Sequence, residues 1–264
     1  MPPVRPSPIF LAILAATAAT TFVLATNNET SRVVVFLFVV LGWILSLTLH
    51  EFAHAAMAYI GGDRSVREKG YLTLDPTKYT DLSLSLIMPV VFVLIGGIGL
   101  PGGAVWINQG AIRNPVHRTL VSLAGPFANI VCGALCLVPI GLGIVTLADN
   151  WSLTLALGFL GVLQIGAVIL NMIPIPGFDG YGAIDPHLTT SARRTIAPLR
   201  QYGFMIVFFG LFFFEPAGRA FWDLVSAIAN FFGGDGEVGL GGDELLGAEL
   251  RARGYREFRF WSDR

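Results

Sequence analysis

The sequence predicts an all-α membrane protein that crosses the bilayer several times, and its composition and apolar runs carry that prediction. Of its 264 residues, 54% are hydrophobic and only 13% are charged, and the mean hydropathy is +0.67. Soluble domains carry about 25% charged residues. Because lipid accepts only segments whose backbone groups are satisfied internally, long apolar runs predict helices. A net charge of −1 gives no support for nucleic-acid binding.

About six apolar runs approach or exceed the roughly 20 residues that a membrane helix needs. The first run follows Arg5 and resembles a signal peptide, but its length and the further runs favour a first transmembrane helix. A partly amphipathic stretch, 217–232, follows the last run. The predicted membrane segments are residues 9–25, 33–60, 82–100, 119–148, 152–172 and 203–214.

The chain divides by composition into a membrane domain, residues 1–232, and a polar tail, residues 233–264. The tail is Gly-rich with mixed charge. It could form a short amphipathic helix on a surface, but its composition favours disorder.

The run 33–60 contains the motif His-Glu-Phe-Ala-His at residues 50–54. On a helix, His50 and His54 project from one face and can chelate one cation, while Glu51 lies close enough to polarise a bound water. Zinc lowers the pKa of such a water to about 7, and a carboxylate can move its proton. Three ionisable residues on one turn of a membrane helix favour a functional site over a hydrogen-bonded packing network.

A catalytic zinc site usually needs a third protein ligand. The best candidate is Asp179, in NMIPIPGFDG at residues 171–180. The prolines break the helix and the glycines free the backbone, so the carboxylate can be directed towards another helix. Taken alone, however, Asp-Gly after prolines favours an ordinary polar turn.

The direction of the runs helps to decide between these interpretations. If 33–60 runs inward, Asp179 meets His50 only when 152–172 also ends on the inner side. Residues 61–118 must then begin and end inside, so 82–100 should be re-entrant or peripheral. The Gly/Pro-rich stretch 96–103 offers a turning point, and such backbone would line an aqueous pocket. The positive-inside rule agrees for Arg64, Arg67, Lys69, Lys78, Arg113, Arg118, Arg193, Arg194 and Arg200.

Two segments between the runs alternate apolar and polar residues. They are YLTLDPTKY at 71–79 and AVWINQGAI at 104–112. Alternation of this kind predicts short extended segments, and prolines disfavour a helix at the residue before them. The sequence therefore predicts an extended or re-entrant wall beside the site.

The motifs HEFAH, SLAGPFAN at 122–129 and NMIPIPGFDG, in this order, resemble those of the site-2 protease family of intramembrane zinc metalloproteases. The resemblance covers about residues 9–232. GYLTLDP at 70–76 is similar to the GRLTLNP segment of a compact bacterial and archaeal branch, with Asp75 where asparagine is common. We expect neither a PDZ insert nor a CBS domain.

The resemblance implies a three-helix catalytic core that holds one Zn²⁺ per chain. His50, His54 and Asp179 would be the metal ligands, and Glu51 the general base and acid. Asn129 and Asn171 would contact the substrate backbone or the oxyanion. From the residues alone, each asparagine could equally form a hydrogen bond between helices.

The resemblance also implies a reaction and a place. The expected reaction is hydrolysis of a peptide bond within or next to a transmembrane segment of a protein or peptide substrate. Such a helix hides its carbonyls and must unwind first, and the two alternating segments could pair with it. The expected place is a bacterial or archaeal cell membrane, in contact with the lipid bilayer, with the active site nearer the cytoplasmic side. The sequence indicates neither a specific substrate nor an oligomeric state.

Three other functions compete with this interpretation. The first is a non-catalytic membrane protein with a structural or regulatory zinc site. A metal-ion transporter would spread acidic and histidine residues along a route, whereas here they concentrate at one level. A membrane metalloprotease of the prenyl-protein-processing kind would take its third ligand from a glutamate on a later helix. Glu215, in a Glu-Pro turn, is a poor match for that ligand.

Overall fold

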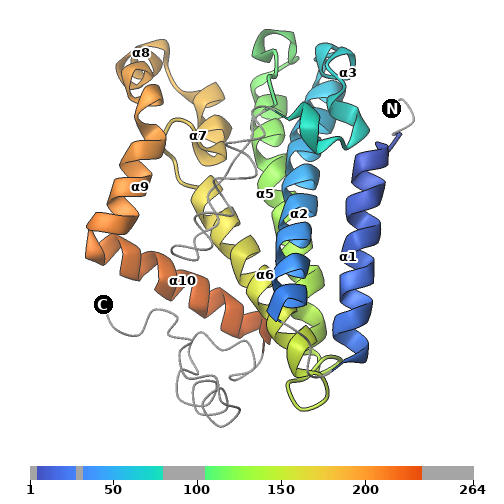
Figure 1. Ribbon diagram of the computed structural model, residues 1–264. Coiled ribbons are helices and arrows are strands. Elements are labelled where there is room, and N and C mark those ends of the chain that lie inside the picture. The colour runs from blue at the N-terminus through green and yellow to red at the C-terminus, as the bar shows by residue number, and fades with distance from the viewer. Residues whose placement is uncertain (1–4, 28–31, 80–104, 234–264) are drawn as a thin grey trace.

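Helices make up all of the regular structure in the part of the chain that the computed structural model describes, residues 5–27, 32–79 and 105–233 (Figure 1). This confirms the all-α prediction for these residues. Four helices are long and apolar enough to cross a membrane: α1 (Pro8–Thr26), α2 (Arg32–Gly61), α5 (Pro115–Gly141) and α6 (Trp151–Asn171). They match the runs predicted at 9–25, 33–60, 119–148 and 152–172.

Helices α1, α5 and α6 each begin at a polar cap. The side-chain oxygens of Ser7, Asn114 and Asn150 each accept a hydrogen bond from a backbone N–H in the first turn of α1, α5 and α6. Such caps satisfy N–H groups that have no partner within the helix. The Asn150 amide also donates to the carbonyls of Leu24 and Ala25. That side chain therefore joins the start of α6 to the end of α1.

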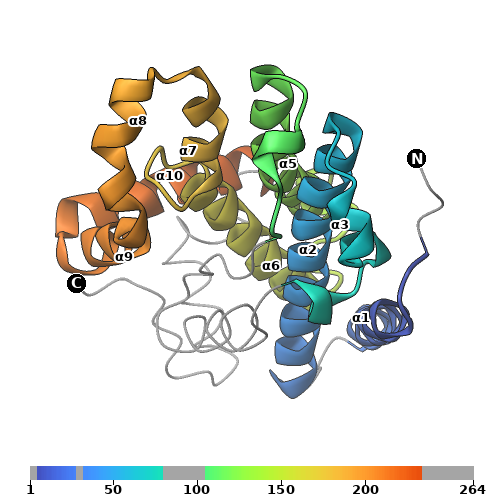
Figure 2. The same cartoon turned by 90° about the horizontal axis from the view of Figure 1, so that it is seen from above.

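Helices α2, α5 and α6 pack against one another, and α1 lies at the edge of this group beside α2 (Figures 1 and 2). Close approach depends on small residues. A Cβ added to Gly42 of α2 would lie 2.5 Å from Leu160 Cδ2 of α6, and one added to Gly161 would meet Leu137 of α5 equally closely. Glycine lets membrane helices approach because their attraction rests on packing rather than on exclusion of water.

The ends of these helices are arranged as the direction argument predicted. The end of α2, the start of α5 and the end of α6 lie at one end of the molecule, and α5 joins α6 at the other (Figure 1). Arg113 N donates to the Gly61 carbonyl at 3.0 Å, so the segment between them leaves and returns at the same place. The predicted run 82–100 lies outside the described residues. Helix α5 ends at Gly141, before the predicted 148, and Gly143 follows in a left-handed conformation with φ 65°.

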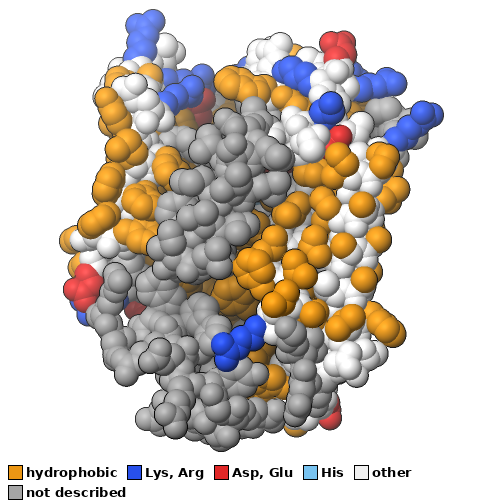
Figure 3. Space-filling model, viewed as in Figure 1, with side chains coloured by type: hydrophobic (Ala, Val, Ile, Leu, Met, Phe, Trp, Pro, Cys, Tyr) orange, Lys and Arg blue, Asp and Glu red, His pale blue; other side chains and the backbone are white. Residues whose placement is uncertain are grey.

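Basic side chains gather at the end of the molecule that carries α3 (Ser65–Glu68) and α8 (Thr190–Ile196) (Figure 3). Orange apolar surface covers the flanks of the helices below them. An apolar belt next to a cationic rim is typical of proteins embedded in a bilayer. With the four apolar helices, it defines an integral membrane protein.

The region after α6 differs from the prediction. Residues 203–214 were expected to form a span, but α9 (Gly203–Phe213) has 11 residues, about 16 Å at 1.5 Å per residue. It could cross only together with residues 190–201, from which it is bent by 64°. Five of the six predicted runs lie within the described residues, and these offer four spans, or five if this bent pair is one span.

Helix α10 (Glu215–Gly233) is the partly amphipathic stretch predicted at 217–232. It turns back from α9 and packs on α6 and α5 (Figure 1). Phe221, Val225 and Ala229 are buried in that contact, in one cluster with Leu137 and Val162. The predicted tail lies outside the described residues from 234 onwards, so the domain boundary near 232 stays a prediction.

The prediction of an extended segment at 71–79 is wrong. The structure has two 3₁₀ turns, η1 (Tyr71–Thr73) and η2 (Pro76–Lys78). Leu74 between them is left-handed, with φ 54°, which no strand permits. Asp75 then caps η2 by accepting from Thr77 N. Local turn chemistry outweighs the alternation of apolar and polar residues here.

The second alternating segment fits its prediction better. Residues 105–108 are non-helical, and half-buried Val105 and Ile107 alternate with exposed Trp106 and Asn108. The segment ends in a short turn, η4 (Gln109–Ala111). It is the part of the predicted extended wall that the structure describes.

Candidate metal centre

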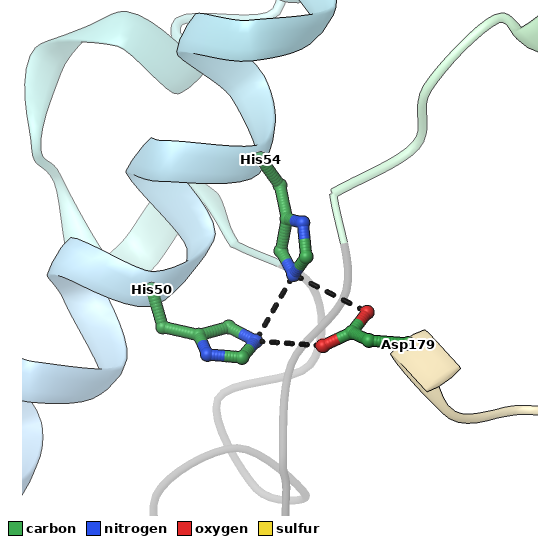
Figure 4. Close-up of side chains that lie close together, drawn as sticks. All are labelled: His50, His54 and Asp179. Carbon is green, nitrogen blue, oxygen red and sulfur yellow. Dashed lines mark hydrogen bonds and ion pairs between the residues drawn. The ribbon is translucent and has the colours of Figure 1, made fainter. Parts of the chain in front are cut away.

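Three predicted residues meet at one point (Figure 4). His50 and His54 project from one face of α2, and Asp179 is the first residue of α7 (Asp179–Ile184). Asp179 Oδ2 lies 3.4 Å from His50 Nε2, and Asp179 Oδ1 lies 3.3 Å from His54 Nε2. The two Nε2 atoms are 3.0 Å apart. The structure therefore brings together the two histidines and the aspartate that the sequence singled out.

The chain between α6 and α7 folds back to direct Asp179 at α2. Gly177 is left-handed, with φ 106°, a conformation that favours glycine. A Cβ added to Gly180 would overlap the Met172 carbonyl, so only glycine allows the end of α6 and the start of α7 to approach this closely. Phe178, the residue just before Asp179, is buried in the core beside them, and this burial fixes the start of α7.

Nε2 of each histidine faces the centre, and Nδ1 of the same ring contacts a residue of α5 that holds the ring in place. His54 Nδ1 lies 2.6 Å from the Val121 carbonyl oxygen of α5. A carbonyl only accepts, so His54 carries its hydrogen on Nδ1 and presents the Nε2 lone pair to the centre. His50 Nδ1 contacts Asn129 Oδ1, also on α5. Ring orientation by such partners is the usual arrangement around histidines that bind metals.

The centre fits a metal ion. The nearest ligand atoms of His50, His54 and Asp179 all lie within 4.8 Å of one another. Asp179 Oδ2 is buried and accepts no hydrogen bond from the described residues. A Cβ added to Gly125 of α5 would lie 2.6 Å from His50 Nε2 and still nearer to His54 Nε2. Zinc binds histidine nitrogen at about 2.0–2.1 Å, so Gly125 leaves room for an ion beside the electron pairs that would hold it.

Glu51 is buried on α2 next to His50 and lines a cavity together with the three candidate metal ligands. Its Oε2 accepts a hydrogen bond from Val105 N at 3.1 Å. The segment that supplies this N–H is itself anchored. Asp63 Oδ2 accepts from Asn108 N at 2.7 Å, and Lys69 Nζ donates to the Trp106 carbonyl at 2.7 Å.

A cavity of about 410 Å³ opens beside the centre. This volume is within the range typical of ligand sites. Helix α2 contributes one wall and residues 105–107 and Gln109 another. Helices α5 and α6, residues 177–179 and Phe204 of α9 contribute the rest. The wall is mixed, since apolar Trp43, Leu47 and Phe204 stand among the polar side chains.

Asn171 and Asn129 occupy different positions at this cavity. Asn171, the last residue of α6, is buried and lines the cavity. Asn129 also lines it, but its oxygen contacts His50 and its Nδ2 lies 2.9 Å from Gln164 Oε1. The helix-to-helix hydrogen bond that the sequence left open is thus present at Asn129. Contact of either asparagine with a substrate stays a prediction.

Sequence reasoning missed two contributors to the site. Gln164 is 1% exposed and links Asn129 to Ser46 of α2. A signal existed, because an amide in the middle of the apolar run 152–172 is unusual at membrane depth. The second contributor is Gly125, which the structure places directly against the imidazoles of His50 and His54.

Fold and site together define a class: a helical membrane protein whose His-Glu-x-x-His helix forms a metal centre with an aspartate from a later segment. The chain is 43% identical over 270 residues to "Putative zinc metalloprotease Rip2" of Mycolicibacterium smegmatis, covering 98% of this chain and 95% of that protein. It is 44% identical over 219 residues to the protein of the same name from Mycobacterium tuberculosis, covering 81% and 82%.

A more distant relative is "Putative zinc metalloprotease YwhC" of Bacillus subtilis, 28% identical over 201 residues, which are 72% of this chain and 86% of that protein. The chain belongs to the site-2 protease family of zinc metalloproteases. No protein-family model and no solved structure matches it.

Proposed function

We propose that this protein is a zinc-dependent endopeptidase that hydrolyses a peptide bond within or next to a transmembrane segment of its substrate. The observation that carries the proposal is the meeting of His50, His54 and Asp179 beside Glu51 on a helix long and apolar enough to cross a membrane. The names of the relatives support the metalloprotease part. The position of the motif within α2 supports the intramembrane part.

In this proposal, His50, His54 and Asp179 hold one Zn²⁺ per chain. Two imidazoles and one carboxylate are a donor set found in catalytic zinc sites. Bound zinc supplies Lewis acidity, which polarises a carbonyl and brings the pKa of water to about 7. The backbone carbonyl of Val121 and the amide of Asn129 orient the two imidazoles.

Glu51 is the proposed general base and acid. Its carboxylate takes the proton of the attacking water and delivers it to the nitrogen of the leaving amine. The hydrogen bond from Val105 N to Oε2 limits rotation of the group that carries the proton. Because Asp63 and Lys69 anchor residues 105–108, the position of Glu51 depends on that segment as well as on α2.

The substrate must reach the cavity as an unwound segment, because a helix keeps its carbonyls in internal hydrogen bonds. Residues 105–108 are the non-helical segment best placed to pair with it by β-addition. Residues 71–79 are less suited because they form 3₁₀ turns. Asn171 is the better candidate of the two asparagines for contact with substrate, since the Asn129 amide is engaged by His50 and Gln164.

Two observations weigh against the competing functions. A structural zinc site is usually closed by four protein ligands, whereas the described residues supply three beside a cavity. A transporter would need further polar clusters along a route. Within the described ranges, His50, His54 and Asp179 form the one group of histidine, cysteine and acidic residues that could hold a metal.

We further propose that the end of the molecule carrying the metal centre faces the cytoplasm of a bacterial cell. The Lys and Arg side chains gathered there support this orientation, because cytoplasmic loops carry the excess of basic residues. The partners are then the lipid bilayer and a transmembrane protein or peptide.

The decisive experiment compares membranes that contain wild type or Glu51→Gln by quantitative proteomics. Substrate fragments that still contain a transmembrane segment should accumulate with Glu51→Gln, and the purified variant should keep its zinc. Glu68→Gln, an exposed glutamate on α3, is the matched control and should behave as wild type. Cleavage by purified Glu51→Gln at the wild-type rate would refute the role of Glu51.

A further inference from the structure

A chain of buried hydrogen bonds leaves His50 and returns to its own helix. His50 Nδ1 contacts Asn129 Oδ1 on α5, and Asn129 Nδ2 lies 2.9 Å from Gln164 Oε1 on α6. Gln164 Nε2 lies 2.9 Å from Ser46 Oγ on α2, one turn before His50. The four residues are between 1% and 6% exposed. They form a ring that joins α2, α5 and α6 behind the metal centre.

The far end of this ring fixes the direction of every hydrogen bond in it. Ser46 Oγ lies 2.8 Å from the Trp43 carbonyl oxygen, which can only accept. The Ser46 hydroxyl therefore donates to Trp43, and its oxygen accepts from the amide nitrogen of Gln164. The amide oxygen of Gln164 then accepts from Asn129 Nδ2. Asn129 Oδ1 is left to accept from His50, which must carry its hydrogen on Nδ1.

The two histidines of the centre differ in what keeps the hydrogen on Nδ1. His54 bonds a backbone carbonyl, whose direction cannot change. The partner of His50 is a side-chain amide, which could turn over and present its nitrogen instead. A turned Asn129 would donate to Nδ1 and leave the His50 hydrogen on Nε2, pointing at Asp179. Among the described residues, the contact that prevents this is the hydrogen bond from Asn129 Nδ2 to Gln164 Oε1.

We propose that Gln164 is a positioning residue that, through Asn129, holds His50 as the Nδ1–H tautomer and so keeps its Nε2 lone pair directed at the metal. The inference rests on the proposed function, since it takes the centre to be a metal site. It assigns a role to the buried amide in the middle of α6. The hydrogen bonds that Gln164 makes to both sides offset the cost of burying it.

The test compares Gln164→Leu with Gln164→Glu in the full-length protein in detergent or nanodiscs. Leucine removes both hydrogen bonds. Glutamate has the same shape and, whether ionised or protonated, still accepts from Asn129, so it should rescue the tautomer. Thr154→Val changes another buried polar residue of α6, whose hydroxyl donates to the carbonyl of the capping residue Asn150, and controls for loss of stability.

Two measurements test this positioning role: the tautomer of His50 and the affinity for Zn²⁺. ¹⁵N NMR of the histidine side chains in metal-free protein should show the Nδ1–H form of His50 in wild type, Gln164→Glu and Thr154→Val, and a mixture in Gln164→Leu. Titration with Zn²⁺ should show affinity lowered about 10- to 100-fold in Gln164→Leu alone, the range known for partners of metal-bound histidines.

An unchanged His50 tautomer and unchanged Zn²⁺ affinity in Gln164→Leu would overturn the inference and leave Gln164 a packing residue. If Gln164→Leu does not fold, Ser46→Ala replaces it. Removing the Ser46 hydroxyl leaves the Gln164 amide without a fixed direction, so His50 should again become a mixture of tautomers, and a pure Nδ1–H form there would equally overturn the inference. Both readouts are made without substrate. A wild type that binds Zn²⁺ but cleaves nothing would therefore refute the proposed peptidase activity and leave the metal site, on which this inference rests, in place.

Discussion

Gly125 of α5 stands so close to His54 of α2 that a methyl group on it would overlap the Nε2 atom of the imidazole. The same methyl group would lie 2.6 Å from His50 Nε2. A glycine at this point does more than let two helices approach. It leaves empty the volume into which both imidazoles direct their lone pairs, and the Asp179 carboxylate faces the same two Nε2 atoms.

Gly125→Ala should therefore lose most of its bound zinc. The methyl group occupies the space of the ion, and the helix itself should tolerate the change, because alanine favours a helix by about 1 kcal/mol over glycine. Metal content measured by mass spectrometry of purified protein checks this. Gly210→Ala in α9, where an added Cβ meets nothing within 4 Å, is the control. Full zinc occupancy in Gly125→Ala would show that the ion lies elsewhere.

Asp179→Ala should lower the zinc stoichiometry well below one per chain. The substitution removes the carboxylate that faces both Nε2 atoms and leaves two ligands, fewer than a stable site needs. Asp149→Ala, an exposed aspartate between α5 and α6, should leave the stoichiometry unchanged. A stoichiometry of one in both variants would argue against Asp179 as the third ligand.

Removal of the metal should lower thermal stability. A ligand that binds only the folded state stabilises it by about 2.7 kcal/mol when its free concentration is 100 times Kd. The ligand atoms come from α2 and from the segment after α6, so the ion would join parts far apart in sequence. Unfolding followed before and after a chelator, and again after zinc is restored, checks this. The melting curve of Gly125→Ala should not respond to either treatment.

Asp63→Ala should reduce activity while leaving zinc in place. The Asp63 carboxylate is 1% exposed and accepts from Asn108 N on one oxygen and from Ser65 on the other. Its loss removes the acceptor of the Asn108 N–H and releases the segment whose Val105 N–H holds Glu51. Hydrogen exchange at Val105 and Asn108 should become faster.

The control for this prediction is Asp63→Asn, which keeps one accepting oxygen and should give an intermediate loss. Cleavage assays paired with metal analysis show whether residues 105–108 support the general base or the metal centre. If Asp63→Ala loses zinc and activity together, residues 105–108 support the metal centre itself rather than the general base.

Much of the fold could be predicted from the sequence, because a bilayer imposes strong rules on composition. The four long helices coincide with apolar runs, and the common end of α2, α5 and α6 follows from the need for Asp179 to meet His50. Predictions failed where short-range backbone chemistry decides. Leu74 and Asp75 turn the alternating segment 71–79 into 3₁₀ turns, and α9 is too short to be a span of its own.

The sequence by itself determined the candidate metal ligands and the candidate base, because a His-Glu-x-x-His spacing on a helix and an aspartate after a Pro/Gly break carry their chemistry in local pattern. Only the tertiary structure decided what surrounds them. Gly125, Gln164 and Ser46 belong to the site through contacts between helices, and no periodicity along one helix records which residue of another helix it faces. The space for the ion and the tautomer of His50 are properties of α2, α5 and α6 packed together.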